Sequence, residues 1–442
     1  MKDQKRWRNG TLVYTFSGLI TLFLLLLLGD FSWSLKERSI IQIVQLLIKE
    51  YGASDTLSAI LTMSMPAALG MVLTPIICYR SDRCRSRWGR RIPYLTLMTP
   101  VASVAIIGMA YSPVLGKFLA QSGICSTPER GVLWMMGVCW TVFEFSSVMA
   151  GALFTALVND VVPHEVMGRF YGLFRCISLG SGIVFNWWFL GFASTHPQYL
   201  FLGVCIIYTL GFMIMCLFVK EGEYPAPEPA SGGKLAATVE YMKLSFSNPY
   251  YCLVLGFYAM AIIAMSPVSS FAVLYATHMH ISMDTYGKAI AATFGLSLVL
   301  SYPMGMLADR IHPLRVGVIM IFVYGVVALS GYFFVIGPKT FLTFFVISVG
   351  IAGCYFNGAA SLLPKLLPQK DFGSMSSAGE IIRSLGTMVG LPVLGVMLDY
   401  TGHKYIYLFL VAGIGCFLTG GMGILLYREF KKHGGPNNYQ AP

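Results

Sequence analysis

Long apolar segments recur along the whole chain and limit what it can fold into. Runs of about 20 residues, such as 12–28 and 199–219, are each long enough to cross a bilayer core of about 30 Å. The composition agrees, since 56% of the residues are hydrophobic and only 12% are charged, which excludes a soluble globular protein. Strands of a membrane barrel would alternate over about ten residues, so these continuous runs predict an all-α polytopic membrane protein.

Twelve transmembrane spans are predicted. Their bounds are 14–38, 56–79, 92–114, 131–158, 170–192, 199–219, 248–276, 284–308, 314–336, 341–365, 373–399 and 404–427. Most Lys and Arg residues outside the spans lie in loops on the side of the two termini, so the positive-inside rule places both termini in the cytoplasm. We interpret the net charge of +11 as a topology signal and expect no nucleic-acid partner.

A proline-rich segment separates two groups of six spans. We therefore predict an N-terminal six-helix bundle at 1–219, a cytoplasmic linker at 220–247 and a C-terminal bundle with a cytoplasmic tail at 248–442. The ten cysteines are scattered without a C-x-x-C pair, and we expect neither a disulfide framework nor a metal site.

The two halves contain a weak internal repeat. Asp82-Arg83 after the second span recurs as Asp309-Arg310 after the eighth, and residues 163–175 after the fourth span match residues 368–380 after the tenth. Two matches in the same order indicate a duplication, and hence two pseudo-symmetric bundles. This is the plan of a secondary carrier whose substrate lies between the halves at mid-depth.

Charged residues inside predicted spans are the first candidates for a site, since each costs about 2.5–3.5 kcal/mol at the bilayer centre. Asp30, Trp33 and Glu37 share one helical face, unless the first span ends at Gly29 and leaves them in water. Glu144 lies mid-span with Trp140 one turn earlier. We read it as a substrate or proton site, with a structural salt bridge as the alternative.

A second group of candidates comes from the fifth and eleventh spans. Arg175 and Glu380 occupy equivalent depths in the two halves and could meet across a central cavity. Glu380 and Arg383, three residues apart, can instead pair on one helix face.

Amide and aromatic side chains complete the predicted substrate site. Asn186, Tyr355 and Asn357 offer hydrogen-bonding groups beside flat rings, which suits a sugar with one apolar face. Trp187 and Trp188 fit such a site or a lipid interface equally well.

A carboxylate is the expected proton carrier. All seven histidines, at 164, 196, 278, 280, 312, 403 and 433, fall in predicted loops or termini, which leaves Glu144, Asp30 and Glu380 in the spans. The chain contains no nucleotide-binding loop, nucleophile elbow or zinc helix, so we expect neither an enzyme nor a cofactor.

Three stretches resemble a known family. SDRCRSRWGRRIPYL is similar to the loop between helices two and three of the major facilitator superfamily, in its glycoside-pentoside-hexuronide:cation symporter branch and the related sucrose carriers. LGDF resembles that branch's helix-one Gly-Asp, which implies that Asp30 contacts sugar. TALVNDVVPHEVMGRFYGLFR resembles the segment between helices four and five, with Asp160, Pro163, Arg169 and Arg175 at matching positions.

The resemblance also implies a coupling ion. Sodium-coupled members carry cation-binding carboxylates at positions that correspond to Gly70 and Thr74, so this sodium site is absent here and H⁺ is expected as the coupling ion. Cys78 replaces the glycine that begins the family's loop motif and is small enough to preserve close helix packing.

The charged residues of the loop between helices two and three are expected to form part of a cytoplasmic gate. Its predicted members are Asp82, Arg83, Arg85, Arg87, Arg90, Arg91, Asp160, Arg169, Asp309 and Arg310. The ion pairs of this gate would hold the cytoplasmic ends of the helices together and exchange at little cost.

The sequence therefore predicts a monomeric carrier in a bacterial inner membrane that imports a sugar or glycoside, with proton symport as the expected coupling. A carrier of lysolipids or amphipathic drugs is one alternative. A receptor or scaffold that keeps the carrier fold without transport is another, although such a protein would have no reason to keep charges in its interior.

Overall fold

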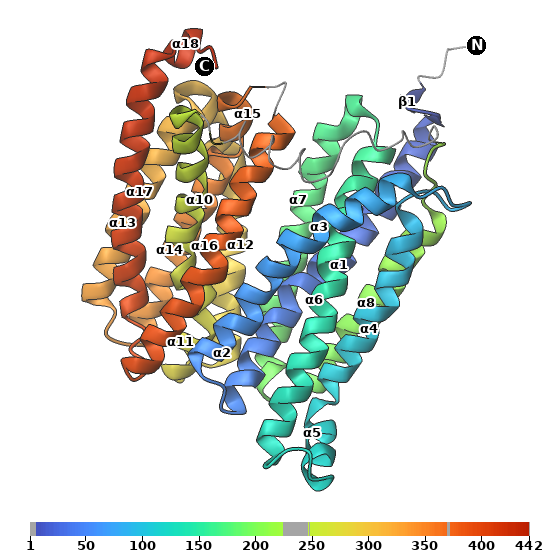
Figure 1. Cartoon of the computed structure of the whole chain (residues 1–442), viewed down its shortest axis with the longest axis vertical. Coiled ribbons are helices and arrows are strands. Elements are labelled where there is room, and N and C mark those ends of the chain that lie inside the picture. Colours follow the sequence, from blue (N-terminus) through green and yellow to red (C-terminus); the bar gives the residue numbers. More distant parts are fainter. Residues whose placement is uncertain (1–5, 224–245, 247, 369–371, 442) are drawn as a thin grey trace. The chain divides into compact units, whose positions relative to one another are not determined.

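The computed structural model describes residues 6–223, 246, 248–368 and 372–441 (Figure 1). Within these residues, twelve helical segments are long and apolar enough to span a membrane. The prediction of an all-α polytopic membrane protein is thereby confirmed.

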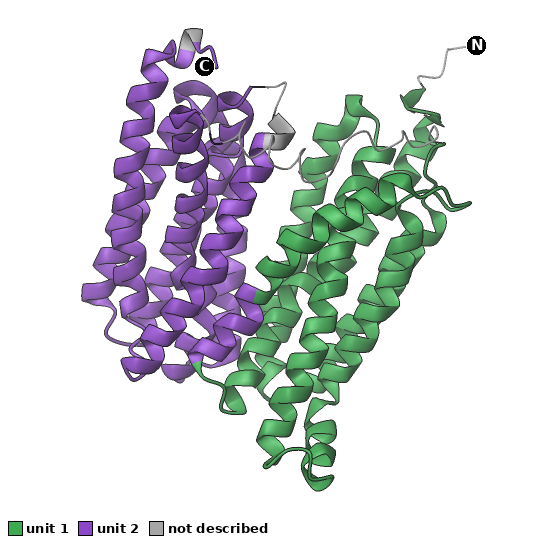
Figure 2. Ribbon diagram, viewed as in Figure 1, with its two compact units in different colours: residues 1–54, 65–229 green, residues 55–64, 230–442 purple. Residues whose placement is uncertain are grey.

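The helices form two compact units (Figure 2). Unit 1 consists of residues 1–54 and 65–229, and unit 2 of residues 55–64 and 230–442. The second span therefore changes unit along its length, which no sequence pattern indicated. Most of the predicted linker lies outside the described residues.

Unit 1 begins with an antiparallel hairpin of β1 (Trp7–Asn9) and β2 (Leu12–Tyr14). Its main helices are α1 (Phe16–Glu50), α3 (Met65–Arg83), α4 (Ile92–Ala110), α5 (Ser112–Gln121), α6 (Pro128–Val161), α7 (Met167–Val184) and α8 (Pro197–Phe218). Three short turns complete it, namely η2 (His164–Val166), η3 (Phe185–Phe189) and η4 (Leu190–Ser194). Helix α1 packs against α7 and α8, and α6 packs against α3, α4 and α5.

Unit 2 begins with the short α2 (Asp55–Ala59) and the π-helical turn η1 (Ile60–Ser64), both of which pack against α16. Its other helices are α10 (Pro249–Ser270), α11 (Ala272–His278), α12 (Met283–Ile311), α13 (Pro313–Phe334), α14 (Pro338–Gly358), α15 (Leu362–Leu366), α16 (Phe372–Tyr400), α17 (Tyr407–Lys432) and α18 (Gly435–Asn438). Helix α17 packs against α10 and α13, and α12 packs against α14.

Helix α1 is longer than the sequence pattern predicted. It continues past the predicted end at residue 38 to Glu50, which gives a length of roughly 52 Å at 1.5 Å per residue. Asp30 lies in its interior and is fully buried, so the alternative in which the first span ends at Gly29 is wrong. The helix continues because its polar residues find partners within unit 1, such as Ser147 for Lys36.

The loop between α3 and α4 is fixed by a residue from the far end of unit 1. The carboxylate of Glu221 accepts hydrogen bonds from the backbone N–H groups of Arg90, Arg91 and Ile92 at 2.8–2.9 Å. It thereby caps the amino end of α4, where free N–H groups and the helix dipole favour an anion. Gly89 makes this contact possible, because its φ is +108° and a Cβ there would lie 2.6 Å from the Glu221 carboxylate carbon.

This contact predicts the relative cost of two glycine substitutions. Gly123 also has a positive φ, of +73°, but a Cβ there would meet nothing within 4 Å. Gly123→Ala should lower the free energy of unfolding by about 1–2 kcal/mol through backbone strain alone. Gly89→Ala should lower it clearly further, because Glu221 must also move. Thermal unfolding of both variants in detergent measures the difference, and equal midpoints would contradict the capping role of Glu221.

Candidate functional site

The centre of unit 1 holds a buried positive charge. Lys36 on α1 is 0% exposed, and its Nζ donates a hydrogen bond of 2.7 Å to the Ser147 hydroxyl and lies 3.0 Å from Glu37 Oε1. Aromatic rings surround the ammonium group, with the Trp33 ring centroid at 3.5 Å and those of Phe143 and Tyr208 at 5.0 and 5.1 Å. A desolvated ammonium group gains cation–π stabilisation from such rings. We call Lys36, Glu37, Glu144, Trp33 and Ser147 the Lys36 cluster.

Sequence analysis did not single out Lys36. It lies two residues before the predicted end of the first span, in the run LKER. The available signal was Trp33 three residues earlier, which places a ring on the same helix face. Its hydrogen-bond partner lies 111 residues away, beyond the reach of any local pattern.

Two predicted acids lie in or beside this cluster. Glu144 on α6 is close enough to Lys36 and Glu37 to interact electrostatically with both. Asp30 is fully buried one and a half turns before Lys36. Its Oδ1 accepts a hydrogen bond of 3.1 Å from Ser34, and its Oδ2 has no hydrogen-bond partner among the described residues.

Two arginines extend the charged region toward α7. Arg38 donates a hydrogen bond of 3.2 Å to the Ser178 hydroxyl and interacts electrostatically with Asp30, Glu37 and Arg175. Charged groups of both signs on α1, α6 and α7 thus interact electrostatically within unit 1. The helix-five arginine predicted from the sequence belongs to this region.

The predicted aromatic and amide residues of unit 1 have different environments. Trp140 is buried, with its ring centroid 5.3 Å from that of Phe143. Asn186 is also buried and donates a hydrogen bond of 2.8 Å to the carbonyl of Gly182. Trp187 and Trp188 are 44% and 59% exposed, as expected of rings at a lipid interface.

Unit 2 contains a cavity of about 460 Å³ with a mixed lining. The aromatic part is formed by Tyr258, Tyr355 and Phe356, and the polar part by Ser376, Ser377 and Glu380. The Tyr355 hydroxyl is buried and has no hydrogen-bond partner in the described part of the chain. Tyr258, Ser376 and Ser377 were not predicted from the sequence.

Glu380 is held in place from two sides. Its Oε1 accepts a hydrogen bond of 2.5 Å from the Tyr258 hydroxyl, and its Oε2 accepts one of 2.7 Å from Arg383 Nε. The pairing of Glu380 with Arg383 is the alternative that the sequence left open. Asn357, near the same cavity in sequence, donates a hydrogen bond of 3.3 Å to the carbonyl of Ser297.

The predicted gate residues of unit 1 form an ion-pair network. Arg90 and Arg91 both contact Asp160, at 2.6 and 3.2 Å, and Arg91 contacts Asp82 at 2.5 Å. Arg91 also donates to the Ser81 hydroxyl. The network joins the ends of α3, α4 and α6.

The other predicted gate residues lie at the surface. The guanidinium of Arg83 stacks 3.7 Å from the Tyr79 ring centroid, and Arg85 donates to the carbonyl of Asp82 at 2.7 Å. In unit 2, Asp309 lies 3.5 Å from the Lys365 ammonium group. Arg87, Arg169 and Arg310 are exposed.

Comparisons with known proteins agree with this architecture. Residues 264–441 match the model of the Major Facilitator Superfamily. The sucrose transport protein SUT1 of Oryza sativa subsp. japonica is 24% identical over 259 residues, which cover 51% of this chain and 47% of the rice protein. The human membrane-associated transporter protein is 26% identical over 194 residues, covering 41% of this chain and 35% of that protein. The chain thus spans about half the length, or less, of these curated relatives.

A solved structure shows the same fold over nearly the whole chain. The crystal structure of a D-xylose-proton symporter superposes with a TM-score of 0.67 at 13% identity, covering 92% of this chain and 97% of that one. This confirms the prediction of twelve helices in two pseudo-symmetric six-helix bundles. The named relatives are transport proteins, and the sequence analysis likewise expected no enzyme. Residues 264–441 are thus similar to the Major Facilitator Superfamily in sequence, and the fold of the chain is similar to that of the solved symporter.

Proposed function

We propose that this protein is a secondary transporter that imports a sugar or glycoside by alternating access, coupled to protons. In this proposal it lies in a bacterial inner membrane with both termini in the cytoplasm. The observation that carries the proposal is the Lys36 cluster, an ammonium group and two carboxylates gathered inside a membrane-spanning bundle.

A buried charge of this kind is costly to keep for folding alone. Moving an ion out of water costs several kcal/mol, and apolar residues of similar volume often stabilise a protein as well as a buried ion pair does. Ionisable groups within spans therefore mark substrate or proton pathways by default. Lys36 and Glu144 come from different helices, so a change in the protonation of one alters the forces between α1 and α6.

The cavity in unit 2 supports a sugar as the substrate. Its volume of about 460 Å³ lies within the range of about 300–1,000 Å³ that is usual for small-molecule sites. Tyr258, Tyr355 and Phe356 offer ring faces for the apolar side of a pyranose, and Glu380 and the two serines offer hydrogen bonds for its hydroxyls. The relatives named above for sucrose and xylose transport support the same substrate class.

Protons are the proposed coupling ion, with Glu144 as the first candidate carrier and Asp30 as the second. When Glu144 is ionised, Lys36 faces two carboxylates, Glu144 and Glu37. When Glu144 takes up a proton, Lys36 keeps Glu37 as its partner. The ammonium group thus has a charged partner in both states, so protonation of Glu144 leaves no unpaired charge. Gly70 and Thr74 offer no carboxylate for a sodium ion.

We also propose that the network of Asp82, Arg90, Arg91 and Asp160 acts as a cytoplasmic gate. Asp82 is 49% exposed, and an ion pair with such a residue contributes only about 0–1 kcal/mol, whereas Asp160 is 14% exposed and is held by both arginines. The contacts of Asp82 can therefore break at little cost while Arg90 and Arg91 stay paired with Asp160. This low cost suits a carrier whose two states must lie within a few kcal/mol of each other.

The coupling proposal predicts the behaviour of Glu144→Gln. In proteoliposomes, an imposed proton gradient should drive uphill accumulation of radiolabelled sucrose or xylose by the wild type, whether sodium or choline is present. The amide cannot take up and release a proton, so Glu144→Gln should lose uphill accumulation and keep exchange of labelled for unlabelled sugar. Glu129→Gln, on an exposed acid of the same helix, is the matched control and should behave as the wild type.

Sodium-stimulated uptake at constant pH would contradict the proposed coupling ion. Equilibration that ignores every gradient would show a uniporter. Accumulation of lysolipids but not of sugars would show that the substrate is a lysolipid and contradict the proposed substrate class.

The cavity of unit 2 predicts a second result. Tyr258→Phe removes the hydroxyl that holds Glu380 at 2.5 Å, so the carboxylate must be ordered on binding and sugar affinity should fall by up to about tenfold. Sugar-induced thermal stabilisation, which follows RT ln(1 + [L]/Kd), measures this in detergent. Tyr302→Phe, on a residue that is 76% exposed, is the control. Equal stabilisation of both variants would exclude the cavity as part of the sugar site.

A further inference from the structure

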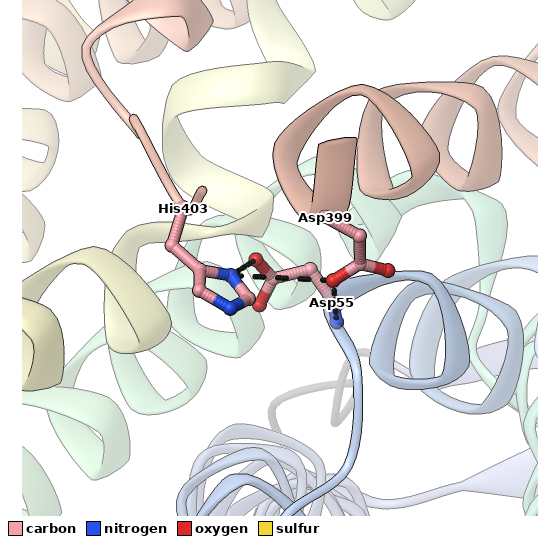
Figure 3. A group of neighbouring side chains, drawn as sticks. All are labelled: Asp55, Asp399 and His403. Atoms are coloured by element: carbon pink, nitrogen blue, oxygen red, sulfur yellow. Dashed lines mark hydrogen bonds and ion pairs between the residues drawn. The ribbon is translucent and has the colours of Figure 1, made fainter. Parts of the chain in front are cut away.

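A polar cluster fixes the beginning of the second span, and all its members belong to unit 2. Asp55 is fully buried, and its Oδ2 lies 2.6 Å from Nδ1 of His403 (Figure 3). Its Oδ1 accepts a hydrogen bond of 2.7 Å from the Tyr405 hydroxyl. Both oxygens of a buried carboxylate are thus satisfied by residues of the turn between α16 and α17.

Asp399 is the second carboxylate labelled in Figure 3, and it binds the backbone of residues 55 and 56. It accepts hydrogen bonds from the N–H of Asp55 at 2.9 Å, and from the N–H and hydroxyl of Thr56 at 3.0 and 2.5 Å. It therefore caps the amino end of α2 from the end of α16. A Cβ at Gly395 would lie 2.8 Å from the Thr56 Cα, so the two backbones pack directly against each other.

The segment held in this way ends at a change in helix geometry. Residues 60–64 form a π-helical turn, and the Ser64 hydroxyl donates a hydrogen bond of 2.8 Å to the carbonyl of Met388 on α16. Pro66 follows, and a proline can neither donate to the carbonyl four residues earlier nor tolerate its close approach. The span passes from unit 2 to unit 1 between Ser64 and Met65. The π-turn is thus a natural hinge between the docked segment and α3.

We propose that protonation of His403 strengthens the docking of residues 55–64 onto α16, and that loss of the proton weakens it. We call this pH-dependent contact the latch. A carboxylate can only accept a hydrogen bond, so the neutral imidazole must carry its hydrogen on Nδ1 and donate it to Asp55. The lone pair of Nε2 then remains for a proton taken from water, to which the 42%-exposed side chain has access. No other bond forms or breaks, and protonation converts a neutral donor into a charge-assisted one.

The biological use of the latch, though not its existence, rests on the proposed transport function. Alternate crossing of twelve spans puts the loops before α2 and after α16 on the side of the membrane opposite to the chain ends. A proton arriving from that side would close the latch, and its departure would free the outer part of the second span. The latch thus gives a carrier a pH-dependent element that does not involve Glu144.

The other ionisable groups around His403 do not change this scheme. Asp399 Oδ1 lies 4.0 Å from Nδ1, so the added positive charge faces two carboxylates. Burial and the neighbouring Asp55 raise the pKa of Tyr405, which therefore remains a hydrogen-bond donor. The ring of His278 on α11 lies 5.3 Å from that of Tyr405, and Lys404 is exposed.

The same three side chains could in principle hold a metal ion, since their ligand atoms lie within 4.8 Å of one another. All four carboxylate oxygens already accept hydrogen bonds, however, and three of those bonds come from the backbone or hydroxyl groups of the docked segment. A metal ion would have to displace the contacts that hold α2. The geometry therefore favours a proton.

Hydrogen–deuterium exchange of the full-length protein tests the latch without any substrate. Protection factors for amides 55–64, corrected for the intrinsic pH dependence of exchange, should be compared at about pH 5 and pH 8, the two ends of the range in which an imidazole ordinarily titrates. The wild type should lose about tenfold in protection at the higher pH, the difference between a charge-assisted and a neutral hydrogen bond.

Three variants control the measurement. His403→Lys, with a permanent charge, should keep high protection at both pH values, and His403→Gln should show low protection at both. Both keep a side chain in the left-handed backbone conformation of His403, whose φ is +60°, so strain does not differ between them. His280→Gln, also at a positive φ but on the turn before α12, should keep the wild-type pH dependence. Burial and the charges of Lys365 and Arg315 lower the pKa of His312 to about 4, below the range tested.

Equal protection of the wild type at both pH values, or a pH dependence that persists in His403→Gln, would overturn the latch. Zinc that restores protection at the higher pH in the wild type but not in His403→Gln would replace the proton by a metal ion. A pH-dependent latch in a protein that transports no sugar would contradict the proposed function and leave this inference standing.

Discussion

The positive charge of Lys36, fully buried inside unit 1, is the constraint that the neighbouring helices must satisfy. Helix α1 must bring partners to the ammonium group from α6 and α8, because no single helix can surround it. Small residues allow this approach. A Cβ at Gly151 on α6 would lie 3.0 Å from the Trp33 ring, and one at Gly211 on α8 would overlap the Ser32 hydroxyl. The cluster can therefore form only because these helices pack closely.

Unit 2 also holds a charged side chain that needs partners, the Glu380 carboxylate, but with fewer charges around it. Glu380 has Arg383 on its own helix and the Tyr258 hydroxyl on α10, so one ion pair and one hydrogen bond satisfy the carboxylate. The remaining polar surface faces a cavity in which the Tyr355 hydroxyl has no hydrogen-bond partner among the residues that the structure describes. Unit 1 thus concentrates charge and unit 2 concentrates hydrogen-bonding and aromatic surface. This division of chemistry is consistent with the proton-coupled sugar carrier proposed above.

The sequence predicted the features that follow from partition between water and lipid. Apolar runs located all twelve spans, and the cost of buried charge singled out Asp30, Glu144 and the Glu380–Arg383 pair. Features that depend on tertiary contacts escaped it. Tyr258 binds Glu380 across 122 residues, Glu221 caps α4 across about 130, and His403 reaches Asp55 across 348. The sequence left open whether residues 34–50 continue the first helix, since the polar residues of this segment are tolerated only because distant helices supply partners.

The central claim is that the charges of the Lys36 cluster serve transport and not folding. The most direct test measures stability and sugar binding together in the triple variant Lys36→Met/Glu37→Gln/Glu144→Gln, which removes the ammonium group and both carboxylates of the cluster. Replacing buried, paired charges by neutral side chains of similar size is often neutral or stabilising, so the unfolding midpoint should be at least that of the wild type while sugar-induced stabilisation is lost. A large fall in the unfolding midpoint with sugar binding retained would show that the cluster is structural and would contradict the account.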